Sequence, residues 1–69
     1  MYYRLKIEIS RRGYTIKKFA SKLSISEKSL RNKINGTTEF TWSEVLAIRD
    51  LIDPDMLLEE LFKKESKIA

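Results

Sequence analysis

The chain repeats a pattern in which an apolar residue precedes a helix-capping residue and a second apolar residue follows four places after the cap. The pattern occurs at Tyr14-Thr15 with Phe19, at Ile25-Ser26 with Leu30, at Phe40-Thr41 with Val45 and at Ile52-Asp53 with Leu57. This arrangement is a hydrophobic staple around an N-cap. At the third start Glu44 completes a capping box, and at the fourth Pro54 occupies the first helical position. The pattern therefore predicts four short helices.

Helix-ending residues agree with these starts. Gly13 ends the segment that precedes Tyr14. Asn35-Gly36 ends the helix that begins at Ser26, as a left-handed C-cap does. The predicted helices cover residues 16–23, 27–35, 41–52 and a last segment from 53 that frays over 63–69. We expect residues 1–69 to form a single domain, because a chain of this length builds only one core.

The first segment is ambiguous from its pattern alone. Leu5, Ile7 and Ile9 alternate with charged residues as in a strand, whereas Leu5 and Ile9 also have the spacing of one helix face. A lone strand would have no partner, so we predict a helix over residues 3–12. The fold class is then all-α, a compact domain of five helices. The expected core is Leu5, Ile9, Phe19, Ala20, Leu23, Ile25, Leu30, Ile34, Phe40, Val45, Ile48, Leu51, Leu58 and Phe62.

The connection between the second and third predicted helices is very short. Only Ser24, Ile25 and Ser26 separate them, and so short a link makes two helices cross steeply. A close crossing needs a small residue at the contact, and Ala20 lies there. This is the geometry of a helix-turn-helix, in which the second helix enters the DNA major groove.

Residues 14–26, together with the ending over residues 30–36, resemble the helix-turn-helix of the XRE, or Cro/repressor, family. Residues 37–44 are similar to a branch found in Gram-positive phages and prophages, and the resemblance covers about residues 4–62. It implies a lambda repressor-like fold and a DNA-binding transcriptional regulator. Two positions depart from the family pattern, since Ile16 replaces the usual Gln and Ser24 replaces the usual Gly. Ser24 must then adopt the positive φ that non-glycine residues disfavour.

The third helix carries the candidate base-reading residues on its outward positions, Glu27, Lys28, Arg31 and Asn32. Arginine bonds bidentately to guanine and asparagine to adenine, while a glutamate accepts from cytosine. Lysine reaches a guanine or a phosphate.

A second set of residues is expected to contact phosphates, which fixes the register of a protein on DNA without reading sequence. Thr15 and Ser26 head helices whose free N–H groups attract anions, and Arg12 adds charge. The predicted phosphate-binding residues are Thr15, Lys17, Ser26, Lys33, Asn35 and Thr37.

The distribution of charge supports a polyanionic partner. Residues 1–36 contain ten basic and two acidic residues, a net charge of +8, while residues 37–69 contain four basic and eight acidic residues, a net charge of −4. A folded domain of this kind has one positive face. The acidic residues of the last two helices are expected to face away from DNA.

The composition narrows the function classes. With no cysteine and no histidine, the chain lacks disulfides, the usual zinc ligands and the usual general base. We expect no enzymatic activity, no metal and no cofactor or small-molecule substrate. No apolar run approaches the ~18 residues of a membrane span and no signal-peptide pattern follows Met1, so a cytoplasmic location is expected.

Apolar residues near the C-terminus exceed what so small a core absorbs. Met56, Leu57, Leu61 and Ile68 are predicted to form part of a two-fold homodimer contact. The alternative is that they complete the core of the monomer. Trp42, on the second position of the fourth helix, is expected to be partly buried, either under the loop before it or against a sugar-phosphate edge.

Two functions fit the sequence. The first is a Cro-like homodimeric regulator whose operator half-sites lie about one helical turn apart, ~34 Å. The alternative is a protein-interaction module of the same fold, acting as an antirepressor or antitoxin on a partner protein. A protein binder would show apolar residues on the third helix, where Lys28, Arg31 and Lys33 stand instead.

Overall fold

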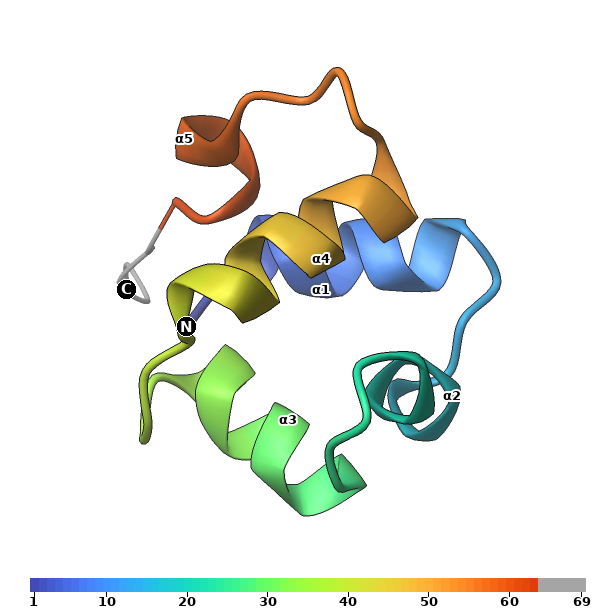
Figure 1. Cartoon of the computed structure of the whole chain (residues 1–69), viewed down its shortest axis with the longest axis vertical. Helices are drawn as coiled ribbons and strands as arrows, with labels where there is room; N and C mark the ends of the chain where they lie inside the picture. Colours follow the sequence, from blue (N-terminus) through green and yellow to red (C-terminus); the bar gives the residue numbers. More distant parts are fainter. Residues whose placement is uncertain (64–69) are drawn as a thin grey trace, which may run out of the picture.

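The computed structural model describes residues 1–63 and contains five helices in this range and no strand (Figure 1). The helices are α1 (Tyr3–Arg11), α2 (Ile16–Lys22), α3 (Glu27–Asn35), α4 (Trp42–Ile52) and α5 (Leu58–Leu61). The all-α prediction is confirmed, and α1 resolves the ambiguity of the first segment in favour of a helix. In the range described, none of these helices has the length and apolar character that crossing a bilayer requires.

Three of the four predicted helix starts are confirmed by their capping bonds. The hydroxyls of Thr15, Ser26 and Thr41 accept hydrogen bonds from the backbone N–H three residues on, at 3.1, 3.0 and 3.2 Å. The Glu44 carboxylate in turn accepts a hydrogen bond from the backbone N–H of Thr41 at 2.8 Å, which completes the capping box. At the first start the Tyr14 and Phe19 rings pack edge to face with centroids 5.2 Å apart, so the staple is formed.

The first three helices end in the same way. In each case two backbone bonds of a Schellman motif close the last turn around a residue of positive φ: Gly13 after α1, Ser24 after α2 and Gly36 after α3. After α2, Ile25 donates to the Ala20 carbonyl at 3.1 Å and Ser24 donates to the Ser21 carbonyl at 3.1 Å. The predicted positive φ of Ser24 is confirmed at 60°.

The fourth predicted helix start is wrong. Asp53 ends α4 in an extended conformation, and its carboxylate accepts a hydrogen bond from the N–H of Asp55 at 3.0 Å. That bond forms a local turn around Pro54, in which an aspartate satisfies the backbone without starting a helix. α5 begins only at Leu58 and has no side-chain cap. The predicted frayed tail, apart from Lys63, lies outside the described residues.

The core agrees largely with the expected set. The fully buried residues that were predicted are Leu5, Ile9, Phe19, Ala20, Leu30, Ile34 and Ile48. Those that pack against the core while keeping some exposure are Leu23, Ile25, Phe40, Leu51 and Phe62. Val45 and Leu58 are also only partly buried. Two core residues were not predicted, Ile52 and Leu61, both of which come from the region where the helix start was misplaced.

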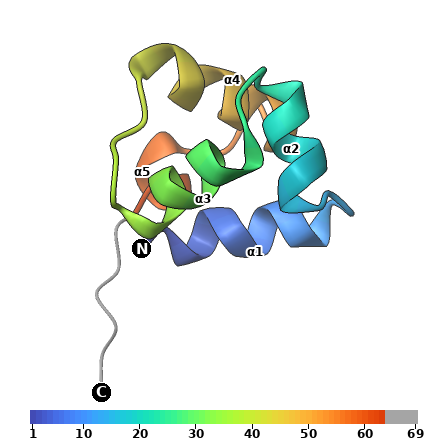
Figure 2. The same cartoon turned by 90° about the horizontal axis from the view of Figure 1, so that it is seen from below.

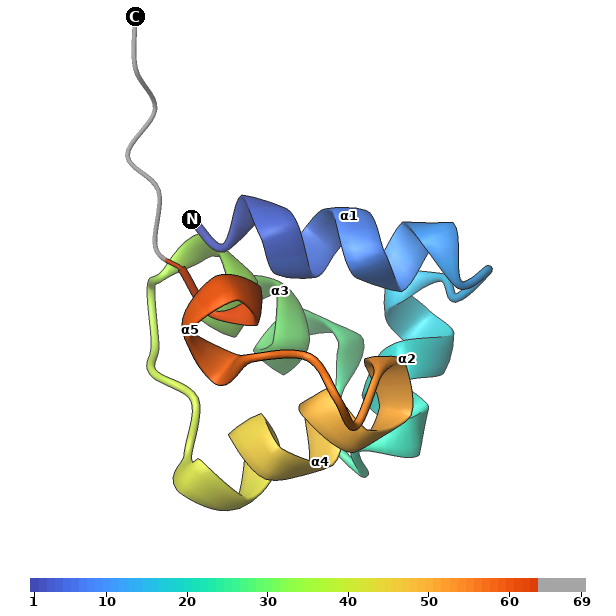
Figure 3. The same cartoon turned by 90° about the horizontal axis from the view of Figure 1, so that it is seen from above.

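α5 and α3 lie at opposite ends of the long axis of the domain, with α1 and α4 at mid-height (Figure 1). Seen along that axis, α1 and α4 lie on opposite sides of α5 and α3 (Figure 3). At one side of the domain, the rings of Tyr2, Phe40 and Phe62 form an aromatic cluster. The ring of Tyr2 lies 5.5 Å from that of Phe40 and 6.0 Å from that of Phe62. The N–H of Tyr2 also donates to the carbonyl of Ile34 at 2.9 Å, which attaches the N-terminus to the end of α3.

A buried carboxylate connects α1 to α4. Glu8 is 2% exposed and forms ion pairs with Arg4, Arg11 and Arg12. Arg12 also donates to the carbonyl of Ile52, the last residue of α4, at 2.6 Å. Burial raises the pKa of Glu8, but the hydrogen bond from Arg12 and the three positive charges outweigh it, so the pKa lies below its ordinary value. Arg12 is therefore engaged within the fold, contrary to its expected role beside phosphates.

Candidate nucleic-acid interface

The junction of α2 and α3 is as short as the sequence predicts, and the two helices cross steeply. Figure 1 shows α2 almost end-on while α3 runs across the view, so the two helices cross steeply. Ala20 is fully buried, with 1% exposure, and its small side chain permits the close approach. The Schellman turn at Ser24 reverses the chain within three residues, which fixes the direction in which α3 leaves.

α3 buries Leu30 and Ile34 and turns a polar edge away from the core. Of the four predicted base-reading residues, Lys28 and Arg31 are exposed, while Glu27 and Asn32 are partly exposed. Figure 2 shows α3 at the front of the face that it forms with α2, with no other helix lying over it. The fold thus brings the four residues onto one accessible edge, which we call the α3 edge.

Two members of the α3 edge bind one another. The Glu27 carboxylate oxygen Oε2 accepts hydrogen bonds from Arg31 at 3.1 Å from Nε and at 2.6 Å from Nη2. The pair is one helical turn apart and its side chains are 59% exposed for Arg31 and 39% for Glu27. An exposed pair of this kind adds only about 0.3–0.5 kcal/mol to stability. Its main consequence is the orientation that it gives to the guanidinium.

The predicted phosphate-binding residues separate into two groups. The hydroxyls of Thr15 and Ser26 cap their helices. An anion at either position would therefore bind the remaining backbone N–H groups of the first helical turn. Lys17, Asn35 and Thr37 are exposed on α2 and at the end of α3. The backbone N–H of Thr37 donates to the carbonyl of Asn32 at 2.9 Å and is already satisfied.

The structure corrects the assignment of Lys33. Its ammonium donates to Oε1 of Glu44 at 2.8 Å and to the carbonyl of Glu39 at 3.3 Å, and its side chain is only 15% exposed. Lys33 therefore faces the start of α4 and is not available to a phosphate. Burial raises the pKa of Glu44, but the hydrogen bonds from Lys33 and Thr41 outweigh this effect and the pKa lies below its ordinary value.

The positive charge that is not used within the fold is concentrated near the α2–α3 junction. Within residues 1–63, six exposed lysines form no ion pair: Lys6, Lys17, Lys18, Lys22, Lys28 and Lys63. Three of these belong to α2 and one to the α3 edge. The acidic α5 lies at the other end of the domain (Figure 1). The domain thus has the polarity that the charge of its two halves indicates.

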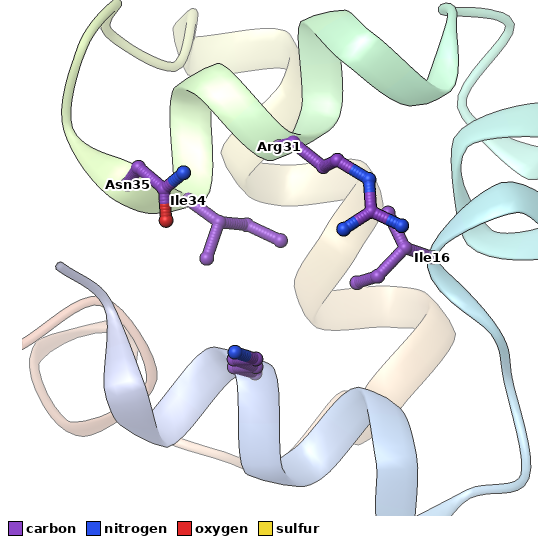
Figure 4. A pocket seen from close by; sticks show the side chains of 5 residues that line it. Ile16, Arg31, Ile34 and Asn35 are labelled. Atoms are coloured by element: carbon purple, nitrogen blue, oxygen red, sulfur yellow. The ribbon is translucent and has the colours of Figure 1, made fainter.

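A small hollow lies between α1, α2 and α3, and the sequence did not predict that Lys6 would line it. Figure 4 shows Arg31 extending from α3 toward Ile16 at the start of α2. The lining of the hollow consists of Lys6, Ile16, Arg31, Ile34 and Asn35. Lys6 gave no signal in the sequence, because its proximity to α3 depends on how α1 packs against a helix more than twenty residues away.

Three expectations about apolar residues are tested by the fold. Leu61 is fully buried, so it belongs to the monomer core and not to a dimer surface. Leu57 is 62% exposed and Met56 partly buried, while Ile68 lies outside the described residues. Trp42 is 67% exposed, so its expected partial burial is wrong.

Comparisons of the chain with protein-family models, with curated proteins and with solved structures found no match. The functional interpretation therefore depends on the geometry and charge of the site itself.

Proposed function

We propose that this chain is a sequence-specific double-stranded DNA-binding regulator that inserts α3 into the major groove. The observation that carries the proposal is the α3 edge, which the tight turn at Ser24 presents free of other elements. The major groove of B-DNA admits one α-helix, and its base edges pair with the side-chain types found on this edge.

The electrostatics support the same partner. Lys17, Lys18, Lys22 and Lys28 are exposed and without ion pairs around the α2–α3 junction. Lysines in such positions neutralise phosphates and release counterions, which gives DNA binding a steep dependence on salt. In this proposal Lys17, Asn35 and Thr37 contact the backbone beside the helix that reads the bases.

The regulator acts as a homodimer on a pseudo-palindromic operator with half-sites ~34 Å apart. The buried Leu61 takes no part in the contact between protomers. Among the described residues that follow α4, Leu57 is the exposed large apolar side chain available for it.

The alternative, a module that binds a partner protein through α3, requires apolar side chains on that edge. The exposed residues of α3 are Lys28, Arg31 and Asn35, which favour a polyanion over a protein surface. This comparison concerns α3 alone.

Selection from a pool of random duplexes tests the proposal. We expect one enriched, palindromic sequence, bound with an affinity that falls steeply as salt rises. Arg31→Ala is expected to lower affinity for that sequence by about tenfold or more, because a bidentate base contact is lost, while the melting temperature changes little. Failure to enrich any sequence, together with weak binding that is insensitive to salt, would overturn the proposal.

A further inference from the structure

We infer that Glu27 is a positioning residue, which holds Arg31 for the reading of one guanine, and that Glu27 itself reads no base. The inference rests on the proposed function, because it assigns separate roles to two residues of the α3 edge. It also replaces the interpretation drawn from the sequence, in which Glu27 accepts a hydrogen bond from cytosine.

The argument begins with the donors of the guanidinium. Arginine has five N–H groups in a fixed plane. Glu27 occupies two of them, the N–H of Nε and one N–H of Nη2. Among residues 1–63, both N–H groups of Nη1 and the second N–H of Nη2 have no hydrogen-bond acceptor. The edge formed by Nη1 and Nη2 presents two parallel donors, which is what guanine O6 and N7 require.

The bond to Glu27 selects which edge of Arg31 can meet a base. Without it, either the Nε–Nη2 edge or the Nη1–Nη2 edge can engage a guanine. With it, the first edge is occupied and only the second keeps two parallel N–H groups for a base. A side chain restrained before binding loses less conformational freedom on binding, so the orientation that Glu27 gives is expected to increase the preference for guanine.

The hollow beside the pair offers the guanidinium few hydrogen-bond acceptors. Arg31 extends toward Ile16, whose apolar side chain offers no hydrogen-bond acceptor (Figure 4). Lys6 lies across the hollow and supplies no acceptor either. Asn35 also lines the hollow and has an amide oxygen, but among residues 1–63 the hydrogen bonds of the Arg31 guanidinium go to Glu27. Glu27 is therefore the group that orients it.

Glu27 is poorly suited to reading a base alone. A carboxylate that faces DNA without a cation is repelled by the phosphates. Paired with Arg31, it forms a unit with no net charge, and Oε2 is already engaged twice. Its place at the first position of α3 is also favourable for a carboxylate, because the helix dipole is positive there.

The test compares base preferences of matched variants. Wild type, Glu27→Gln, Glu27→Asp, Arg31→Ala and the double variant Glu27→Gln/Arg31→Ala are each subjected to selection from random duplexes. Competition between two duplexes that differ only at the selected guanine then measures the preference. Glu39→Gln is the control, since it removes an exposed loop carboxylate and alters net charge equally.

We expect Arg31→Ala to abolish a guanine preference of about tenfold, and Glu27→Gln to reduce it by about threefold or more. Affinity of Glu27→Gln for random-sequence duplex should rise, because a negative charge near phosphates is removed. Glu27→Asp keeps the charge but shortens the reach, so it should weaken the preference without raising nonspecific affinity. In the Arg31→Ala background, Glu27→Gln should change no base preference.

Two outcomes overturn the inference alone. In one, wild type selects a guanine and Glu27→Gln leaves the preference unchanged. In the other, Glu27→Gln alters the preference at a different base pair in the Arg31→Ala background, which makes Glu27 a reader. If wild type selects no sequence at all, the proposed function fails and the inference fails with it. Circular dichroism at each step verifies that the variants are folded.

Discussion

The ammonium of Lys33 and the carboxylate of Glu44 join the end of α3 to the start of α4. Lys33 Nζ lies 2.8 Å from Oε1 of Glu44, and the same oxygen accepts the backbone N–H of Thr41 at 2.8 Å. One carboxylate thus completes a capping box and holds a lysine from another helix. Lys33 is drawn to the α4 side of α3, whereas Lys28 is on the outward edge of the same helix.

Substitution of these two lysines should separate stability from DNA binding. Lys33→Ala is expected to lower the free energy of unfolding by about 1–2 kcal/mol, because a largely buried carboxylate loses its partner. Lys28→Ala is expected to leave stability within about 0.5 kcal/mol of wild type.

Binding should show the reverse. The slope of log affinity against log salt should fall by about 1 for Lys28→Ala and stay unchanged for Lys33→Ala. Denaturant unfolding and salt titrations of duplex binding measure both quantities. A reduced salt slope for Lys33→Ala, at unchanged stability, would return Lys33 to the phosphate-binding group.

The sequence predicted the features that depend on a few adjacent residues. The caps at Thr15, Ser26 and Thr41 and the turn at Ser24 each form within about five residues, and the structure confirms all four. Asp53 shows the limit of such reasoning. The local sequence of an aspartate before a proline is compatible with either a helix start or a turn. Packing of the surrounding chain decides between the two.

The site was predictable in part for the same reason. The α3 edge follows from the helical period, once the core residues Leu30 and Ile34 are known. The engagement of Lys33 by Glu44 spans eleven residues and depends on how α4 packs, so no local pattern contains it. The position of Lys6 beside Arg31 is likewise a product of helix packing.

The backbone of Ser24 should be strained, and substitution by glycine should relieve the strain. Its φ of 60° lies in the region that costs a non-glycine residue about 1 kcal/mol or more. We expect Ser24→Gly to raise the free energy of unfolding by up to about 1 kcal/mol, with part of the gain offset by the freer unfolded chain. Ser21→Gly within α2 is the matched control and should destabilise by about 0.5–1 kcal/mol. A lower melting temperature for Ser24→Gly would contradict this account.

The buried Glu8 should make stability dependent on acid pH. Its pKa in the folded state lies below the ordinary value of 4.5, so folding favours the charged carboxylate. The stabilisation is complete above pH 4.5 and is lost as the pH falls through the lower pKa of the folded state.

Glu8→Gln should therefore lower stability at pH 7 by about 2 kcal/mol, since three arginines lose their counterion. It should also flatten the fall in stability below pH 4.5. Denaturant titrations between pH 7 and pH 3 measure both effects. Glu59→Gln, on exposed α5, serves as the control and should leave stability at pH 7 within about 0.5 kcal/mol. Equal pH profiles for wild type and Glu8→Gln would argue against the role of the ion-pair cluster.

Truncation of Leu61 should lower the stability of the protomer, whereas truncation of Leu57 should not, because Leu61 is fully buried and Leu57 is 62% exposed. Leu61→Ala is expected to cost about 2–5 kcal/mol through the cavity that it leaves, which is a large part of the stability of a domain this small. Leu57→Ala should change the stability of the protomer by less than about 0.5 kcal/mol.

If Leu57 contributes to the contact between protomers, Leu57→Glu should shift the dimer toward monomer in sedimentation experiments, since a charge on each protomer would meet its two-fold mate. Affinity for a palindromic duplex should then fall while affinity for a single half-site stays unchanged. Leu57→Gln is the matched control, because it removes the apolar side chain without adding charge, and its effect should be smaller. A dimer that persists unchanged in Leu57→Glu would place the contact on another surface, and the exposed Trp42 would be the next side chain to substitute.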